Sequence, residues 1–162
     1  YPALLPDNNR LIFSSNQNGN YQLYLTDFSS KKATQLTFGD ANISEPIVSP
    51  DGSHIVYLSE SKYANVFGID LITKKEERIT DATKMQLFPN LSKDQTKLVY
   101  QMTDDNSNIR SSPLRVKNLA NKSESVLENQ KGYWAKWSPV NDEIVYLQNE
   151  GLVESLWKTS PG

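Results

Sequence analysis

One pattern of apolar and polar positions is written four times along this chain of 162 residues. Its clearest copy, residues 45–59, reads EPIVSPDGSHIVYLS, which is an apolar run, a Ser-Pro-Asp-Gly turn and a second apolar run. Asp-Gly supplies the positive φ angles that a tight hairpin needs, so this copy predicts two antiparallel β-strands. The other copies are LLPDNNRLIFSS (4–15), FPNLSKDQTKLVYQM (88–102) and WAKWSPVNDEIVYLQ (134–148).

The copies recur at a nearly constant spacing. The first turn residues Pro6, Pro50, Lys93 and Pro139 follow one another at intervals of 44, 43 and 46 residues. Each turn is followed by an apolar triplet and a third strand, and in three copies by a fourth. The predicted third strands are 22–27, 66–71, 114–119 and 155–160, and the predicted fourth strands are 33–37, 76–80 and 123–127.

Four short strands per repeat predict an all-β chain with almost no helix, because no stretch shows a capped period of 3.6 residues. A four-stranded unit that repeats roughly every 40–45 residues is typical of a β-propeller, in which each unit is one blade. Residues 55–58 are apolar on both faces of their strand, as a sheet packed between two neighbours requires. We predict a single propeller domain or fragment over residues 1–162, with four-stranded blades at about 1–37, 43–80, 86–127 and 132–160.

Composition narrows the function classes. The formal net charge is −2, so the chain has no basic field and we expect no direct nucleic acid binding. It contains no cysteine, which excludes disulfides and thiolate metal sites. No apolar run is long enough to span a membrane and no leader pattern is present, so we expect no membrane insertion by this segment. Because the chain starts at Tyr1 rather than Met, we expect it to be a segment of a longer protein.

The repeats resemble the TolB-like β-propeller family, a WD-like group with a Pro-Asp signature. Residues 13–37 are similar to its Ser…Asn-Gly-Asn…Gln-Ile-Tyr…Asp…Leu-Thr blade, and residues 49–59 match its Ser-Pro-Asp-Gly-x-x-Ile-Val-Tyr core. The third and fourth copies depart from this pattern, because 93–95 and 139–142 replace the Pro-Asp-Gly turn and 103–113 form a longer loop. The resemblance implies a propeller face that holds partner proteins.

The number of copies has its own consequence. Rings that resemble this family generally have six or more blades, whereas this chain has four copies and the last stops before its fourth strand. The N-terminal end offers no spare strand to complete that last blade. We therefore expect a partial or open propeller whose exposed faces and strand edges favour self-association through the terminal blades.

Residues with catalytic or metal-binding chemistry are few. His54 is the single histidine and has no Cys or second His as a partner, so it is interpreted as a surface turn residue. The chain has no Gly-x-Ser-x-Gly elbow, no phosphate-binding glycine loop and no recognisable pair of catalytic carboxylates. The run 104–108 has the composition of a calcium loop but lacks its Gly and terminal Glu, which favours a polar loop. Three residues at the ends of the third strands are predicted to cap turns rather than to form a ligand ring: Asp27, Asp70 and Asn118. Together these observations predict no catalytic, metal-binding or cofactor-binding residue.

The candidate partner-binding surface follows from propeller geometry, in which the residues that enter each innermost strand line one mouth of the central channel. By alignment these are residues 43–45, 86–88 and 132–134. They differ between blades while the turns stay similar, and exposed aromatic residues with a polar rim are typical of a protein-binding patch. Packing of the same rings between blades is the open alternative. The candidate residues are Ser44, Glu45, Gln86, Phe88, Tyr133 and Trp134.

Three functional hypotheses follow. The first is a non-enzymatic protein-interaction or sensing module, periplasmic, in a bacterial envelope protein or a membrane-bound regulator such as a transcriptional regulator. The second is the substrate-gating propeller of a prolyl-oligopeptidase-like serine peptidase whose catalytic domain lies outside this segment. The third is carbohydrate binding, with Trp134 and Tyr133 as stacking platforms. The identity of the protein partner does not follow from the sequence, because a fold does not define a function.

Overall fold

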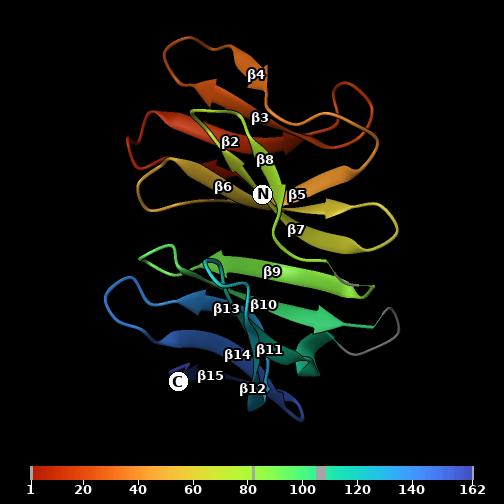
Figure 1. Ribbon diagram of the computed structural model, residues 1–162, viewed down its shortest axis with the longest axis vertical. Helices are drawn as coiled ribbons and strands as arrows, with labels where there is room; N and C mark the ends of the chain where they lie inside the picture. Colours follow the sequence, from red (N-terminus) through yellow and green to blue (C-terminus); the bar gives the residue numbers. More distant parts are fainter. Residues whose placement is uncertain (1, 82, 105–108, 162) are drawn as a thin grey trace. The chain divides into compact units, whose positions relative to one another are not determined.

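The computed structural model describes residues 2–81, 83–104 and 109–161, and it confirms the predicted all-β architecture (Figure 1). Within these residues the regular elements are β-strands and one 3₁₀ turn, Ile109–Ser111. The strands form four antiparallel sheets, and the strands of each sheet lie side by side in the order of the chain. This is the strand order of propeller blades. The predicted partial propeller with an incomplete last repeat is therefore confirmed.

The first compact unit, residues 1–81, contains two four-stranded sheets. One sheet consists of β1 (Ala3–Leu4), β2 (Arg10–Ser15), β3 (Gln22–Asp27) and β4 (Ala33–Gln35), and the other of β5 (Asn42–Val48), β6 (His54–Glu60), β7 (Ala64–Asp70) and β8 (Glu76–Arg78).

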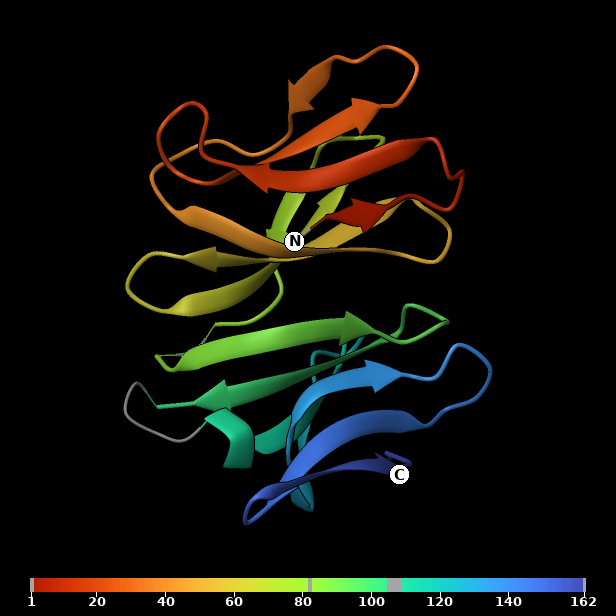
Figure 2. The same ribbon diagram turned by 180° about the vertical axis from the view of Figure 1, so that it is seen from behind.

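The second compact unit, residues 82–162, contains a four-stranded and a three-stranded sheet (Figure 2). The four-stranded sheet consists of β9 (Met85–Leu91), β10 (Lys97–Thr103), β11 (Pro113–Asn118) and β12 (Glu124–Lys131), and the three-stranded sheet of β13 (Tyr133–Trp137), β14 (Ile144–Glu150) and β15 (Val153–Thr159).

The core of the first unit forms where its two sheets face each other. Ile12 and Leu23 of the first sheet belong to one buried cluster with Ile55 and Tyr57 of the second, and all four are fully buried. Each fully buried apolar side chain contributes about 1.5–3 kcal/mol through removal of its surface from water. The two sheets therefore depend on each other for stability, because a lone four-stranded sheet would leave one apolar face in water.

The second unit repeats this arrangement. Val99 and Leu114 of the four-stranded sheet are buried in one cluster with Ile144 and Tyr146 of the three-stranded sheet. The same alternation of side chains along the second and third strands produces both clusters. The second strand of the second sheet is buried on both faces, since Val56 and Leu58 are buried as well as Ile55 and Tyr57.

The hairpin between the first and second strands of a sheet is held by a serine and an aspartate. The Ser49 hydroxyl donates to Asp51 Oδ1 at 2.6 Å, and the His54 amide donates to Ser49 Oγ at 2.9 Å. In the next repeat Ser92 donates to Asp94 Oδ1 at 2.6 Å, which lowers the pKa of Asp94. In these two hairpins the Ser-x-Asp sequence therefore fixes the turn and ties it to the first residue of the second strand.

One turn position in these hairpins requires a left-handed backbone. Gly52 occupies it at φ 74°, and the equivalent residues Asn8 and Gln95 have φ angles of 55° and 61°. A side chain in this region costs roughly 1–2 kcal/mol, which glycine avoids. The replacement of Gly by Gln in the third repeat therefore leaves strain in a turn whose strands are still formed.

Gln95→Gly is expected to raise the free energy of unfolding by up to about 1 kcal/mol, because relief of the left-handed strain exceeds the added flexibility of the unfolded chain. This corresponds to an increase in Tm of about 2–4 °C for a chain of this size, measured by circular dichroism. Gly52→Ala is the matched control and should lower Tm, since a Cβ at that position would lie 3.1 Å from Pro6 Cδ. A lower Tm for Gln95→Gly would contradict the interpretation.

Candidate functional site

The innermost strands that carry the candidate residues share a backbone irregularity. In β5, β9 and β13 the register against the neighbouring strand shifts at a β-bulge. At these bulges Glu45, Phe88 and Trp134 have φ angles of 49°, 54° and 54°. Non-glycine residues seldom adopt this left-handed region, and bulges that redirect a side chain are concentrated near functional sites. Each of the three is the last residue of a candidate segment predicted from the sequence.

Two of the three predicted segments bring aromatic rings together in the second unit. The Trp134 ring centroid lies 6.2 Å from that of Phe88 and 5.4 Å from that of Tyr133, with interplanar angles of 88° and 65°. These are the edge-to-face arrangements that aromatic rings favour. Tyr133 is buried and Phe88 is partly buried, whereas 55% of the Trp134 surface is exposed. Tyr133 therefore packs inside the unit, whereas the Trp134 ring is exposed to solvent and packs against Phe88 and Tyr133.

A polar network lies beside these rings. The Arg110 guanidinium is 5.5 Å from the centroid of the Tyr133 ring and pairs with Glu154 Oε1 at 3.1 Å. The Tyr133 hydroxyl donates to the same Glu154 oxygen at 2.5 Å, and this hydrogen bond to a carboxylate raises the pKa of Tyr133. Tyr133 thus stays a neutral donor at neutral pH, and its ring is held from two sides.

The 3₁₀ turn that carries Arg110 follows β10 in the chain and contacts β13 and β14 (Figure 2). The buried Gln101 amide donates to the carbonyl oxygens of Ile109 and Gly132, which fixes the turn next to the start of β13. Gly132 is required there, because a Cβ would lie 2.4 Å from Tyr146 Cδ2. Ile109 is 40% exposed. We call the resulting surface the aromatic patch; it consists of Phe88, Ile109, Arg110, Tyr133, Trp134 and Glu154.

The other candidate residues have different positions. Gln86 is buried in β9, opposite Met102 of β10. Ser44 and Glu45 are partly buried in β5, which belongs to the first unit. The structure therefore brings Phe88, Tyr133 and Trp134 together within the second unit.

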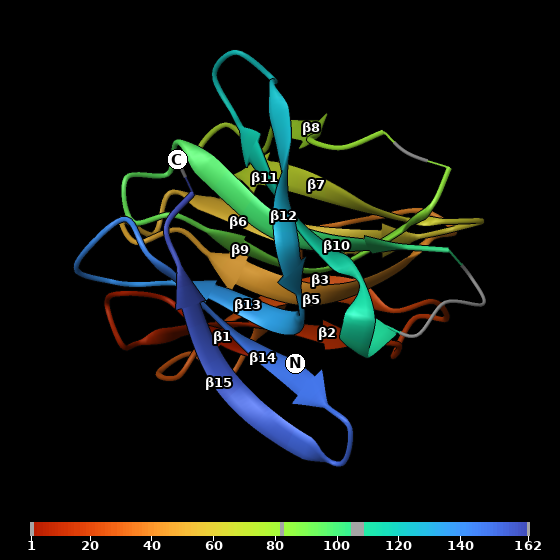
Figure 3. The same cartoon turned by 90° about the horizontal axis from the view of Figure 1, so that it is seen from below.

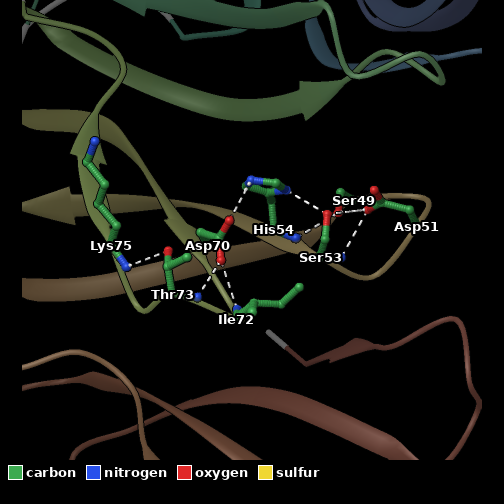
Figure 4. A network of polar contacts seen from close by, with 8 residues as sticks. All are labelled: Ser49, Asp51, Ser53, His54, Asp70, Ile72, Thr73 and Lys75. Carbon is green, nitrogen blue, oxygen red and sulfur yellow. Dashed lines mark hydrogen bonds and ion pairs between the residues drawn. The ribbon is translucent and has the colours of Figure 1, made fainter.

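The single histidine belongs to a polar network at the turns of the second sheet (Figure 4). His54 Nδ1 lies 2.6 Å from Ser53 Oγ, and His54 Nε2 lies 3.3 Å from Asp70 Oδ2. Ser53 Oγ also donates to Asp51 Oδ1 at 2.7 Å. The imidazole thus links two turns, which agrees with its interpretation as a surface turn residue.

Ser53, His54 and Asp70 contain the same chemical groups as a catalytic triad, but their arrangement has another role. A catalytic serine transfers its proton to histidine, whereas Asp51 competes for the proton of Ser53. Asp70 Oδ1 accepts hydrogen bonds from the amides of Ile72 and Thr73 at 2.8 and 2.7 Å. The His54 side chain is 50% exposed. The network therefore stabilises the turns on an open surface.

The capping role predicted for the residues at the ends of the third strands is confirmed. Asp27 Oδ1 accepts hydrogen bonds from the amides of Ser29 and Ser30. Asn118 Oδ1 accepts from the amides of Ala120 and Asn121 at 3.0 and 3.1 Å. Asp70 makes the equivalent pair, so a carboxylate and an amide oxygen are interchangeable in this turn.

Within residues 2–81, 83–104 and 109–161 the structure contains no cluster of three or more His, Cys, Asp or Glu side chains that could hold a metal ion. The calcium-loop-like run 104–108 lies outside this part of the chain except for Asp104, which pairs with Lys84 at 2.9 Å. No helix of the described chain is long and apolar enough to cross a membrane.

A groove of about 470 Å³ lies between the hairpin turns of the second unit. Ser92, Asp94, Val140 and Asp142 are among its lining residues, and the buried Trp137 forms part of its wall. Asp142 is already paired with Lys97 at 2.8 Å. Asp94 and Asp142 of the groove are therefore already bound by Ser92 and Lys97. The groove is not a candidate catalytic site.

Sequence reasoning did not find Arg110, Ile109 or Glu154. Ile109 and Arg110 lie in a loop that has no counterpart in the other repeats, and Glu154 begins a strand as an ordinary exposed acid. The only signal in the sequence was the extra length of residues 103–113, since loops that exceed the repeat often carry function. Their proximity to Tyr133 is a result of the tertiary structure.

Comparisons with known proteins identify the class of this fold. The family description "TolB beta propeller domain" matches residues 1–161. The chain therefore belongs to the TolB β-propeller family. A segment of 48 residues is 38% identical to a protein described as Protein TolB homolog from Chlorobaculum tepidum; it covers 30% of this chain and 11% of that protein.

Solved structures show the same fold. The crystal structure of TolB from Acinetobacter baumannii matches with a TM-score of 0.78 and 21% identity over 98% of this chain and 40% of that chain. An oligogalacturonate lyase in complex with manganese matches with a TM-score of 0.78 and 21% identity over 96% and 48% of the two chains. Prolyl endopeptidases match with a TM-score of 0.70 and 14% identity over 100% and 28%. The chain thus spans less than half the length of each, and enzymes as well as TolB proteins share this propeller.

The turn at Asp70 leads to a prediction of pH dependence. Hydrogen bonds from the amides of Thr73 and Ile72, together with His54, hold the pKa of Asp70 below its usual value. The unfolded chain then binds a proton more readily, so the contribution of Asp70 to stability is present above about pH 4 and is lost as the pH falls through the folded-state pKa. Asp70→Asn should therefore flatten the loss of stability between about pH 5 and 2, as measured by urea unfolding.

Asn118 provides the control for this prediction, because an asparagine already caps the equivalent turn. Asp70→Asn keeps the cap but lacks the charge, so it should be less stable than the original chain at pH 7 and approach it at low pH. Asp70→Ala also loses the cap and should be less stable than Asp70→Asn at both ends of the range. Equal slopes of stability against pH for the original chain and Asp70→Asn would show that Asp70 does not contribute to acid sensitivity.

Proposed function

We propose that this chain is a protein-interaction module that binds a partner protein at the aromatic patch. The observation that carries the proposal is Trp134, which is 55% exposed and packs edge-to-face on Phe88 and Tyr133. Trp is the residue type most enriched among interface hot spots, and a rigid anchor loses little conformational entropy on binding. The backbone at Trp134 also holds the strained φ of 54° that presents the ring.

The composition of the patch supports a protein partner over a carbohydrate. The apolar centre is bordered by Arg110 and Glu154, which gives the polar rim of a protein interface. Carbohydrate stacking would use the open faces of both Tyr133 and Trp134, but Tyr133 is only 4% exposed and lies against Arg110. Carbohydrate binding is therefore the weaker proposal, and loss of a glycan-array signal in Trp134→Ala would be needed to support it.

Membership of the TolB family supports an extracytoplasmic location, on the outer side of a bacterial inner membrane. The module would then belong to an envelope protein or to the sensing part of a membrane-bound regulator. Both settings require a domain that recognises a macromolecule without changing it chemically. The turn networks of the described chain, including Ser53, His54 and Asp70, are consistent with this non-enzymatic role.

Trp134→Ala is expected to weaken binding of the partner by at least about 30-fold, the effect of losing a hot spot of about 2 kcal/mol. The partner would be isolated from the envelope fraction of the producing bacterium with the tagged chain, and its Kd measured by titration calorimetry. Phe28→Ala is the matched control, because it removes an aromatic side chain of similar exposure outside the aromatic patch. Equal weakening by both substitutions, or by neither, would contradict binding at the patch.

The chain is expected to show no turnover of fluorogenic peptides or p-nitrophenyl esters, because Ser53 is held by Asp51 rather than activated by His54. Activity would be measured beside Ser53→Ala, which removes the hydroxyl that lies 2.6 Å from the His54 ring. Turnover that a single substitution within residues 1–162 abolishes would refute the non-enzymatic assignment.

A peptidase-gating role is the alternative, and the fold similarity to prolyl endopeptidases favours it. In that case the propeller would control access to a serine hydrolase domain elsewhere in the same polypeptide. Labelling of the longer protein by a fluorophosphonate probe would support this alternative. A protein that carries these residues and is not labelled would leave the interaction module as the proposal.

A further inference from the structure

The loop between the second and third strands of the first sheet contains the single Asn-Gly pair of the sequence, Asn18-Gly19. This loop joins β2 to β3, which lie side by side as antiparallel partners (Figure 3). Asn18 is exposed, and Gly19 has a φ of 112°, a conformation that favours glycine. In the described chain no heavy atom lies within 4 Å of the position that a Cβ of Gly19 would take. The surroundings of the peptide bond after Asn18 are therefore open.

The Asn18 side chain connects this loop to the outer strand of the same sheet. Its amide nitrogen donates to Tyr24 Oη at 3.1 Å and to Gln35 Oε1 at 3.2 Å. The Tyr24 hydroxyl also donates to Gln35 Oε1, at 3.1 Å. The three side chains thus form a closed set of hydrogen bonds between the loop, β3 and β4, in which Gln35 Oε1 accepts from both of the others.

Gln35 extends this support to the residues that follow β4. Its amide nitrogen donates to the Thr37 carbonyl at 2.9 Å, and Thr37 Oγ1 accepts the Leu23 amide at 2.9 Å. Between them, the Leu36 amide donates to the Leu23 carbonyl at 2.8 Å. β4 itself is only 3 residues long. Side-chain contacts at Gln35 therefore contribute to holding this short outer strand on β3.

An Asn-Gly pair has a reaction of its own, because glycine places no side chain beside the attacking nitrogen. The Gly19 nitrogen loses its proton to solvent base and attacks Asn18 Cγ. A C–N bond forms, the Cγ–Nδ2 bond breaks, and the amide leaves as ammonia after it takes up a proton. Water then opens the resulting succinimide at one of its two carbonyl groups, which gives aspartate or isoaspartate. Water is the only co-reactant.

We propose that Asn18 is a site of spontaneous deamidation and that the reaction loosens β4. Both products replace the donating amide by a carboxylate, which only accepts hydrogen bonds. The aspartate carboxylate competes for the Tyr24 hydroxyl, so Gln35 Oε1 loses both of its donors. The isoaspartate product also adds a methylene group to the backbone of the loop. This site lies in the first unit, so it is independent of the aromatic patch.

The contacts that give Asn18 its structural role also slow its reaction in the folded chain. Two hydrogen bonds hold its side-chain amide, and the Gly19 amide donates to the Asn16 carbonyl at 3.0 Å. Ring closure requires these contacts to break, so deamidation follows local opening of the loop. Tyr24→Phe removes one acceptor of the Asn18 amide and keeps the buried ring. This substitution should speed deamidation by about twofold or more, the effect of losing one hydrogen bond.

Deamidation would be followed by mass spectrometry of proteolytic peptides after incubation in mildly alkaline buffer, and isoaspartate by enzymatic methylation. We expect Asn18 to exchange NH₂ for OH at a rate that rises with pH, because the Gly19 nitrogen must lose its proton. Asn20 is the internal control, since it lies in the same exposed loop but precedes Tyr21. A capped peptide of residues 16–21 gives the rate without the fold.

Equal modification of Asn18 and Asn20 would overturn the assignment of the site. An unmodified Asn18 in the folded chain, after the capped peptide has been fully converted, would overturn it as well. A rate in the folded chain equal to that of the peptide, or unchanged by Tyr24→Phe, would show that the contacts to Tyr24 and Gln35 do not restrain the reaction.

Asn18→Asp reproduces one product and tests its effect on β4. Hydrogen exchange of the Leu36 amide, measured by NMR, should become about 2- to 10-fold faster, the effect of losing one hydrogen bond. The Ile79 amide is the matched control, because it donates to the Val66 carbonyl at 2.9 Å in the equivalent position of the second sheet. Unchanged exchange at Leu36, or equal acceleration at Ile79, would overturn the proposed loosening of β4.

Discussion

Burial of one sheet face against the next is the constraint on which this structure depends. Each of the four sheets contributes buried apolar residues to a cluster shared with a second sheet, so it needs that neighbour to remove them from water. Ile12 and Leu23 meet Tyr57 in the first unit, and Val99 and Leu114 meet Tyr146 in the second. The repeat therefore specifies an interface as much as a sheet.

The polar residues of the repeat serve a separate purpose, which is to end strands and set the turns. Ser49 and Asp51 fix one hairpin, and Asp70 caps the neighbouring turn at the same end of the sheet. Their hydrogen bonds are local, which is why the turns persist when the sequence varies, as with Asn118 in place of an aspartate. His54 contributes to the same network, and its proximity to Ser53 and Asp70 follows from the turn geometry.

The residues proposed to bind a partner lie where the repeats differ. The bulges at Phe88 and Trp134 keep one backbone shape while the side chains change, so the scaffold presents variable groups on a constant frame. The longer third repeat adds Arg110 beside Tyr133. A propeller can in this way acquire a specific surface without altering the packing between its blades, which is consistent with the shared fold of TolB, lyase and peptidase structures.

The sequence by itself determined the class of fold, the second and third strands and the role of the turns. Period-two apolar patterns and Asp-Gly or Asp-capped turns are local signals, and four copies in register made each more certain. It also located Phe88, Tyr133 and Trp134 as candidate residues. Only the tertiary structure decided that Tyr133 is buried, that Trp134 is exposed and that Gln86 lies inside a sheet. These outcomes depend on a bulge and on contacts between residues far apart in the chain, which no local pattern encodes.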